Sequence, residues 1–410
     1  MKKNINTYLS YYLFILFFLS VFFLYVKHNV GNDSTISEWL INYSGGFTKR
    51  GLIGQICVYI SNLFEINLRD SILIFQISIV LIYFVALYYF FKNLRINKLM
   101  LLSIFTPIFI LYPIAEIEVL ARKEIFIFCI FLLYLNLENN YLKILYKLLM
   151  LPLAVLIWEP VLFFFLFWLA DDIIKKELNK LDINFFKVLI SFIPSLFLAI
   201  FIIFNPINSE SHSVMETYLK INFNETCYMS CEALKTKSSI YDQFNGNFHK
   251  YSLEVFIRYF LIIIIGFGPL IILNKISKVN IQNLLLFKNF NNLLAPKLII
   301  LMPVIFLFAM GYDWGRWVNI SYVFSILFFF NLYKKKLIDI NNSFVEEKNF
   351  KLFENKKIYI VFVIIFCFGW NPKTVISGDV ASFPGYRVPY KVFKIINQKY
   401  LNTNKLNIEN

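Results

Sequence analysis

A single carboxylate interrupts a long apolar block and is the first residue to which chemistry can be assigned. Glu159 is the only charged residue in 148–170, and Pro160 follows it directly. A charge at membrane depth is costly and usually faces a cavity or a partner. Desolvation there also raises the pKa of a carboxylate toward the range that a general base needs. We therefore expect Glu159 to belong to a functional site, with a structural ion pair as the alternative.

Two more carboxylates lie before the second apolar block and are candidate general bases. Asp33 and Glu38 belong to the polar segment 27–70. A base must reach the acceptor hydroxyl and have a pKa near its working pH. The alternative is an exposed loop carboxylate with no catalytic role.

A motif rich in glycine and cations follows in the same segment and predicts phosphate binding. It reads Gly45-Gly46-Phe47-Thr48-Lys49-Arg50-Gly51. Glycine permits close approach of the backbone. Arginine binds phosphate through two parallel hydrogen bonds, and lysine acts as a point charge. The alternative is a flexible loop whose cations extend to the membrane surface.

Further charges gather in two short segments between apolar blocks. Candidate phosphate ligands are Arg122, Lys123 and Arg316, and candidate supporting residues are Glu118, Glu124 and Asp313. Glu118 and Arg122 are spaced i,i+4, so a helical ion pair is the alternative for them. For the Asp313–Trp317 turn, the alternative is an aromatic anchor at the membrane interface with a local salt bridge.

The elements that must position these residues are transmembrane helices. The chain has 410 residues, of which 59% are hydrophobic and 16% charged, whereas soluble domains have roughly 45–50% and about 25%. The apolar blocks approach the roughly 20 residues that cross a bilayer as a helix. They lack the alternation of barrel strands. We expect one all-α integral membrane domain over 1–410, with helices near 8–26, 71–91, 99–112, 125–137, 143–158, 161–174, 187–204, 255–273, 298–311, 317–332 and 358–370.

The distribution of lysine predicts the topology of these helices. Lysine-rich short loops lie on the cytoplasmic side of membrane proteins. All such loops fall on one side if the chain reverses at Glu159-Pro160, where proline disfavours a continuous helix. The result is about eleven crossings, with the N-terminus inside and the C-terminus outside. Segments 27–70 (with an amphipathic helix), 206–254 and 371–410 are then outer, as are all the candidate site residues.

Other motifs carry weaker signals. The three histidines show no metal spacing, so we expect no cofactor, with a divalent metal ion as an open alternative. The net charge of +14 follows from the loop lysines and does not predict nucleic-acid binding. Cys227 and Cys231 can form a disulfide if their loop faces an oxidising compartment. We expect Asp171-Asp172, on the inner side, to be a solvated helix end.

Three short patches resemble a pattern in bacterial multi-pass proteins encoded among surface-polysaccharide genes. They are Tyr43-Ser44-Gly45-Gly46-Phe47-Thr48-Lys49-Arg50-Gly51-Leu52-Ile53-Gly54, Ala121-Arg122-Lys123-Glu124 and Trp158-Glu159-Pro160. That pattern has Arg at the place of Lys49 and His at the place of Trp158. The layout is also similar to the GT-C glycosyltransferase superfamily and the O-antigen polymerases.

This resemblance implies a glycosyltransferase or polysaccharide polymerase in the bacterial cytoplasmic membrane. The partners would be the bilayer and a polyprenyl-linked glycan lipid, whose phosphate the cations hold while Asp33 or Glu38 deprotonates the acceptor. Glu159 would line the site and pair with Arg122 or Arg316. The alternative is a transporter or flippase for a lipid-linked or anionic substrate. Transporters usually show paired repeats, and we find none. The sequence does not predict an oligomeric state.

Overall fold

The computed structural model describes residues 2–30, 34–175, 183–235, 240–279, 290, 292–340 and 355–376. Asp33 and most of the C-terminal tail, 377–410, lie outside the described residues.

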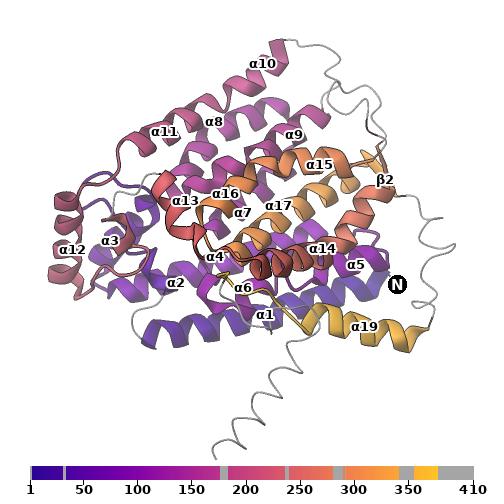
Figure 1. Cartoon of the computed structure of the whole chain (residues 1–410), viewed down its shortest axis with the longest axis horizontal. Helices are drawn as coiled ribbons and strands as arrows, with labels where there is room; N and C mark the ends of the chain where they lie inside the picture. Colours follow the sequence, from indigo (N-terminus) through magenta and orange to yellow (C-terminus); the bar gives the residue numbers. More distant parts are fainter. Residues whose placement is uncertain are drawn as a thin grey trace, which may run out of the picture.

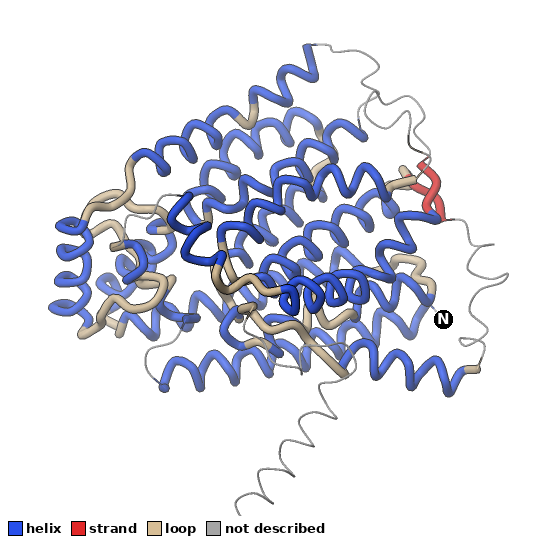
Figure 2. The backbone as a smooth tube through the Cα atoms, in the orientation of Figure 1, coloured by secondary structure: helices blue, strands red, loops and turns tan. Residues whose placement is uncertain are grey.

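The described chain is a bundle of helices with one pair of short strands (Figures 1 and 2). Five helices are long and apolar enough to cross a membrane, and four shorter ones are also apolar. This indicates an all-α membrane protein. The elements are α1 (Lys2–Val30), α2 (Ser34–Ser37), α3 (Gly51–Phe64), α4 (Leu68–Phe91), α5 (Lys98–Phe105), α6 (Tyr112–Ala115), η1 (Ile117–Val119), α7 (Glu124–Asn136), α8 (Asn140–Ile157), η2 (Glu159–Phe164), α9 (Phe165–Lys175), α10 (Ile183–Ile190), α11 (Ile193–Phe204), α12 (Ser209–Phe223), η3 (Glu232–Leu234), α13 (Ile240–Phe248), α14 (Leu253–Ile276), β1 (Ser277–Val279), α15 (Leu294–Leu301), η4 (Met302–Val304), α16 (Ile305–Met310), α17 (Trp314–Lys334), β2 (Ile338–Ile340) and α19 (Lys356–Phe368).

The long helices run side by side, so the bundle has two distinct ends (Figure 1). The short helices α3 and α12 lie at one end, which we call the α3 end. The N-terminus and the strands lie at the other, which we call the strand end. There β1 pairs antiparallel with β2, with Ser277 opposite Ile340. The pairing brings the two lysine-rich segments after α14 and α17 to the same end.

The chain reverses direction at Trp158, as the proline predicts. Helix α8 ends at Ile157, Trp158 is extended with φ −158° and ψ 95°, and η2 begins at Glu159. The start of α8 lies beside the end of α9, because Lys143 pairs with Asp171 and Lys147 pairs with Asp172. The two helices therefore form an antiparallel hairpin, with Glu159 at its tip.

The expectation that Asp171-Asp172 is solvated is wrong, because both side chains are buried. Besides the two lysines of α8, Asp171 accepts a hydrogen bond from Asn331. Asp172 accepts one of 2.7 Å from the Tyr134 hydroxyl. These partners compensate the carboxylates for the loss of water. Their charges are held inside the bundle at the strand end.

Prolines divide three of the expected helices. The segment expected as 99–112 is helical only to Phe105, and Thr106 is extended before Pro107. Two helices, α10 and α11, replace 187–204, with a proline at the start of α11. A 3-10 turn with Pro303 divides 298–311. Each break follows from the missing N–H of proline and its restriction of the preceding residue.

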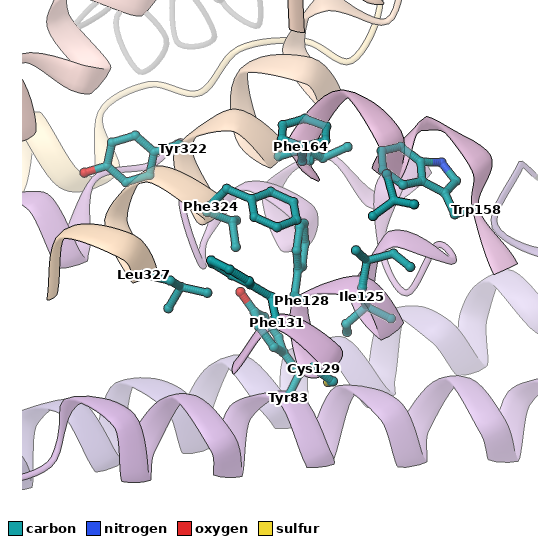
Figure 3. Close-up of a cluster of buried hydrophobic side chains, with 14 of the residues drawn as sticks. Tyr83, Ile125, Phe128, Cys129, Phe131, Trp158, Phe164, Tyr322, Phe324 and Leu327 are labelled. Atoms are coloured by element: carbon teal, nitrogen blue, oxygen red, sulfur yellow. The ribbon is translucent and has the colours of Figure 1, made fainter. Parts of the chain in front are cut away.

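Helix α17 is the central element of the bundle, since every side chain from Trp314 to Leu332 is buried. Its Phe324 stacks on Phe164 and Phe167, at centroid distances of 4.6 and 5.5 Å. Figure 3 shows this aromatic core, which also takes Phe128 and Phe131 from α7. A helix that is buried on all sides fixes the position of both of its ends. It thereby fixes Arg316, at its first turn.

Candidate functional site

Nine of the predicted site residues meet at the α3 end, from four separate stretches of the chain. We call them the charge cluster. Its cations are Lys49, Arg50, Arg122, Lys123 and Arg316, and its carboxylates are Glu38, Glu124, Glu159 and Asp313. The five cations exceed the four carboxylates by one positive charge.

Glu38 lies at the centre of the cluster and is 0% exposed. Its Oε1 accepts a hydrogen bond of 3.2 Å from Arg50, and its Oε2 accepts one of 3.1 Å from Arg122. Arg316 lies 3.8 Å from the same Oε2. One carboxylate thus holds three guanidinium groups. Burial raises the pKa of Glu38, but the surrounding arginines lower it more, so the pKa lies well below its usual range.

Arg50 connects this centre to the tip of the α8–α9 hairpin. Its Nε and Nη2 donate to the two carboxylate oxygens of Glu159 at 2.7 and 2.8 Å. The backbone of Arg50 is left-handed, with φ +63°, a conformation that non-glycine residues rarely adopt. Lys123 Nζ donates to the Arg50 carbonyl oxygen. The strained backbone is therefore held at both its side chain and its carbonyl.

Arg316 makes a second bidentate pair, with Glu124. Its Nε and Nη2 each donate to a Glu124 oxygen at 2.7 Å. Asp313 lies 3.7 Å from Nη1, which is the local salt bridge expected for this turn. The guanidinium also lies 6.0 Å from the Trp158 ring and 5.4 Å from the Trp317 ring. Both tryptophans of the turn, Trp314 and Trp317, are buried, so neither is an exposed interfacial anchor.

The cluster has a deep part and a rim. The rim includes Lys49, Glu159 and Arg50, whose side chains are 42%, 21% and 19% exposed and can contact a ligand from outside. The deep residues Arg122 and Glu124 line a cavity of only about 30 Å³, which is room for one or two water molecules. A phosphate can therefore reach the rim, whereas the deep arginines are occupied by carboxylates.

The pKa of Glu159, at the rim, and the pKa of Lys123, in the interior, are both lowered, but for different reasons. Burial raises the pKa of Glu159, but Arg50 and Lys49 lower it more, so the net shift is downward. Burial lowers the pKa of Lys123 to about 8. An anion bound to Arg50 and Lys49 would compete with Glu159 for the two cations that contribute most to lowering its pKa. The effect of burial would then dominate and raise its pKa.

Some predicted residues have other positions or partners than expected. Glu159 pairs with Arg50 and Lys49, and the expected pairing with Arg122 or Arg316 is wrong. Glu118 is exposed. Glu118 and Arg122, which the structure both describes, form no ion pair with each other, because the chain between them is not an α-helix. The i,i+4 geometry that such a pair needs is therefore absent.

The two predicted glycines, Gly45 and Gly46, act through the backbone of the loop. A Cβ on Gly45 would lie 1.9 Å from the Ser211 carbonyl oxygen, so this glycine permits α12 to pack on the loop. Gly46 has φ +112°, where glycine is favoured. The motif thus places Lys49 and Arg50 by backbone geometry.

Sequence reasoning missed several polar groups around the cluster. The Thr48 hydroxyl, the Tyr43 hydroxyl and the Trp158 and Trp317 indole nitrogens are buried without a hydrogen-bond partner in the described part of the chain. Buried polar groups are normally satisfied, so each such group needs an explanation. Thr48 could have been predicted from the sequence, because its hydroxyl lies within the Gly45–Gly51 motif that predicts phosphate binding.

The cysteine pair lies in the segment between α12 and α13. Cys227 and Cys231 are joined by a disulfide, as the sequence allows for an oxidising compartment. His212 lies close to both sulfur atoms, within 4.8 Å. A disulfide removes the thiolates that a metal would need, so this group does not supply a metal site in its oxidised form.

Comparison of the chain with protein-family models, with curated proteins and with solved structures found no match.

Proposed function

We propose that this protein is a membrane glycosyltransferase or polysaccharide polymerase that takes sugar from a polyprenyl-phosphate-linked donor. The observation that carries the proposal is the excess of one cation over the carboxylates in the charge cluster, with Lys49 and Arg50 at its rim. An anionic phosphate would compensate the excess charge. The buried hydroxyl of Thr48 supports a phosphate at this place, since it has no partner among the described residues.

The proposed topology has about eleven crossings, with the α3 end outside and the strand end inside. Lysine-rich segments at the strand end support it, by the positive-inside rule. The Cys227–Cys231 disulfide, between α12 and α13, supports an oxidising compartment at the α3 end. We place the protein in the bacterial cytoplasmic membrane, with the transfer reaction at its outer face.

We assign the base to Glu159 and a structural role to Glu38. Glu38 is fully buried beneath three arginines, and its lowered pKa makes it a poor proton acceptor. Glu159 is partly exposed at the rim. Binding of the donor phosphate to Arg50 and Lys49 would free Glu159 from its partners and raise its pKa. Asp33 lies outside the described residues and stays the alternative base.

The proposed step balances as a single displacement. The acceptor hydroxyl gives its proton to Glu159, and its oxygen forms a bond to the anomeric carbon of the donor sugar. The bond from that carbon to the phosphate oxygen breaks, and the polyprenyl phosphate leaves with the electron pair. Lys49 and Arg50 contact the leaving phosphate, whose charge grows in the transition state, where such contacts accelerate the reaction.

A transporter or flippase for a lipid-linked anion is the second candidate. The observation that favours it is the second buried group of ion pairs at the strand end, Lys143–Asp171 and Lys147–Asp172. Ion pairs at both ends could act as two gates that open alternately. Such a protein would move the lipid between leaflets and transfer no sugar.

The test uses purified protein in nanodiscs with a radiolabelled polyprenyl-phosphate sugar and candidate acceptors. We expect Lys49→Met to weaken donor binding by roughly 10- to 150-fold, since a charged hydrogen bond contributes about 1.5–3 kcal/mol. Glu159→Gln should abolish transfer. Lys220→Met, on the exposed face of α12, is the matched control and should change neither. Donor movement between leaflets of liposomes without transfer would favour the transporter, and unchanged binding in Lys49→Met would refute the phosphate site.

A further inference from the structure

One cation of the charge cluster, Lys123, has no carboxylate partner. Each of the other four cations forms an ion pair with at least one carboxylate, at 2.7–3.9 Å. Lys123 forms no ion pair with any residue that the structure describes, and its ammonium donates instead to the carbonyl oxygen of Arg50. The positive charge by which the cluster exceeds its carboxylates can therefore be assigned to Lys123.

Lys123 lies where a positive charge is unfavourable. It is 0% exposed, and it directly precedes α7, whose N-terminal end disfavours a cation. Burial of an ammonium without a carboxylate partner is also unfavourable. The titratable and charged groups that face it are Glu38 from the segment after α2, Arg50 at the start of α3, Cys57 within α3, Glu159 from η2, and its chain neighbours Arg122 and Glu124. Because it is fully buried, Lys123 acts on a ligand at the rim through its charge and not by contact.

Lysine differs from arginine in that it can lose its charge in such a place. A guanidinium stays protonated inside a protein, whereas the pKa of a lysine falls readily on burial. Burial lowers the pKa of Lys123 to about 8, although Glu38 opposes the shift. The other lysine of the cluster, Lys49, is 42% exposed and pairs with Glu159. Near neutral pH, Lys123 is thus the residue that decides whether five cations or four face the four carboxylates.

Arg50 connects Lys123 to the rim. Its side chain is 19% exposed and shares Glu159 with Lys49, where we place the donor phosphate, while its carbonyl oxygen holds the Lys123 ammonium. An anion on the Arg50 guanidinium therefore brings negative charge close to that ammonium. A nearby negative charge favours the protonated form of a lysine. Because such coupling is reciprocal, the anion binds more tightly when Lys123 carries its proton.

We propose that the charge cluster takes up one proton, on Lys123, when an anion binds at its rim. The proton comes from solvent and forms an N–H bond with the lone pair of the Lys123 amine, and no electron is transferred to or from the site. The cluster then has the extra positive charge that the anion compensates. Loss of the proton weakens binding and favours release of the anion. This inference rests on the proposed phosphate site and not on the transfer reaction, so it holds equally for a transporter of an anionic lipid.

The test is calorimetric titration of the full chain in nanodiscs with sulfate, which stays a dianion over the whole range of pH tested. We expect sulfate to bind about tenfold more weakly at pH 9 than at pH 7, because one proton is coupled to binding. Lys123→Arg keeps the charge, so it should bind as the wild type does at pH 7 and show no such change. Lys123→Met should bind about tenfold more weakly at pH 7 and also lose the pH dependence. Lys220→Met, which changes an exposed lysine of α12, is the matched control and should keep the pH dependence.

Proton uptake by the wild type keeps the test decisive if neither Lys123 variant folds. Titrations at pH 8 in two buffers of different ionisation enthalpy should show uptake of about half a proton per sulfate. Glu159→Gln should keep the pH dependence, which would identify the titrating group as Lys123 and not that carboxylate. Absence of uptake, equal affinity at pH 7 and pH 9, or a pH dependence that persists in Lys123→Met would each overturn the proposal. No sulfate binding at any pH would refute the phosphate site itself, and this inference with it.

Discussion

Replacement of Glu38 by glutamine tests whether the charge cluster holds the α3 end together. The substitution keeps the shape of the side chain and removes the charge that three arginines share. The excess positive charge of the cluster then rises from one to two. Breaking a buried ion pair by removal of one partner typically destabilises a protein by about 3–5 kcal/mol. We expect a loss of that size for Glu38→Gln.

The assay is reversible unfolding in mixed micelles, followed by tryptophan fluorescence. Glu118→Gln is the matched control, because Glu118 is an exposed carboxylate at the same end; it should change stability by less than about 0.5 kcal/mol. A double-mutant cycle of Glu38→Gln with Arg122→Gln should give a coupling energy of about 0.5–3 kcal/mol. A loss below about 1 kcal/mol, or additive single effects, would refute the ion-pair reasoning.

The wild type and Glu38→Gln should also differ in how their stability depends on pH. The arginines outweigh burial and hold the pKa of Glu38 well below its usual range. Its stabilisation is therefore complete above about pH 4.3, the unfolded-state pKa. It decreases as the pH falls through the lower folded-state pKa. The stability difference between wild type and Glu38→Gln should stay constant from pH 7 to pH 5 and diminish only below about pH 4.

Two further predictions concern packing and the strand end. Gly45→Ala should destabilise the packing of α12 on the loop by about 1–3 kcal/mol, since its Cβ would lie 1.9 Å from the Ser211 carbonyl oxygen. Limited proteolysis should detect this change. Gly246→Ala is the control, because a Cβ at Gly246 would meet open space. Asp172→Asn should destabilise the α8–α9 hairpin by about 3–5 kcal/mol, because the buried Lys147 ammonium loses the carboxylate charge that it contacts. The measurement is the same micelle unfolding, and an unchanged midpoint would contradict it.

The sequence was sufficient to predict the convergence of charges and the chain reversal. Lysine placement and a single proline located the hairpin tip at Glu159, and the break is present after Ile157. The same rule on proline would have predicted the end of α5 before Pro107, where apolar composition alone suggested a longer helix. Local rules of this kind depend only on neighbouring residues, which is why the sequence contains them.

The pairing of the charges could not be predicted, because partners are distant in the chain. Glu159 contacts Arg50, 109 residues away, whereas the sequence favoured Arg122 or Arg316. Asp171 was expected in solvent, because hydropathy does not reveal a buried lysine on another helix. Charge type and position are encoded locally, but the choice among several cations is made by the packed helices.

The α8–α9 hairpin also has a consequence for biosynthesis. Helix α8 carries Lys143 and Lys147, and their partners Asp171 and Asp172 are on α9. While the ribosome makes the residues between them, the lysines have no counter-charge from α9. At roughly 5–20 residues per second, that interval is about 1.5–6 s. The first helix should therefore stay with the insertion machinery until the second is complete, so that the two enter the membrane as one unit.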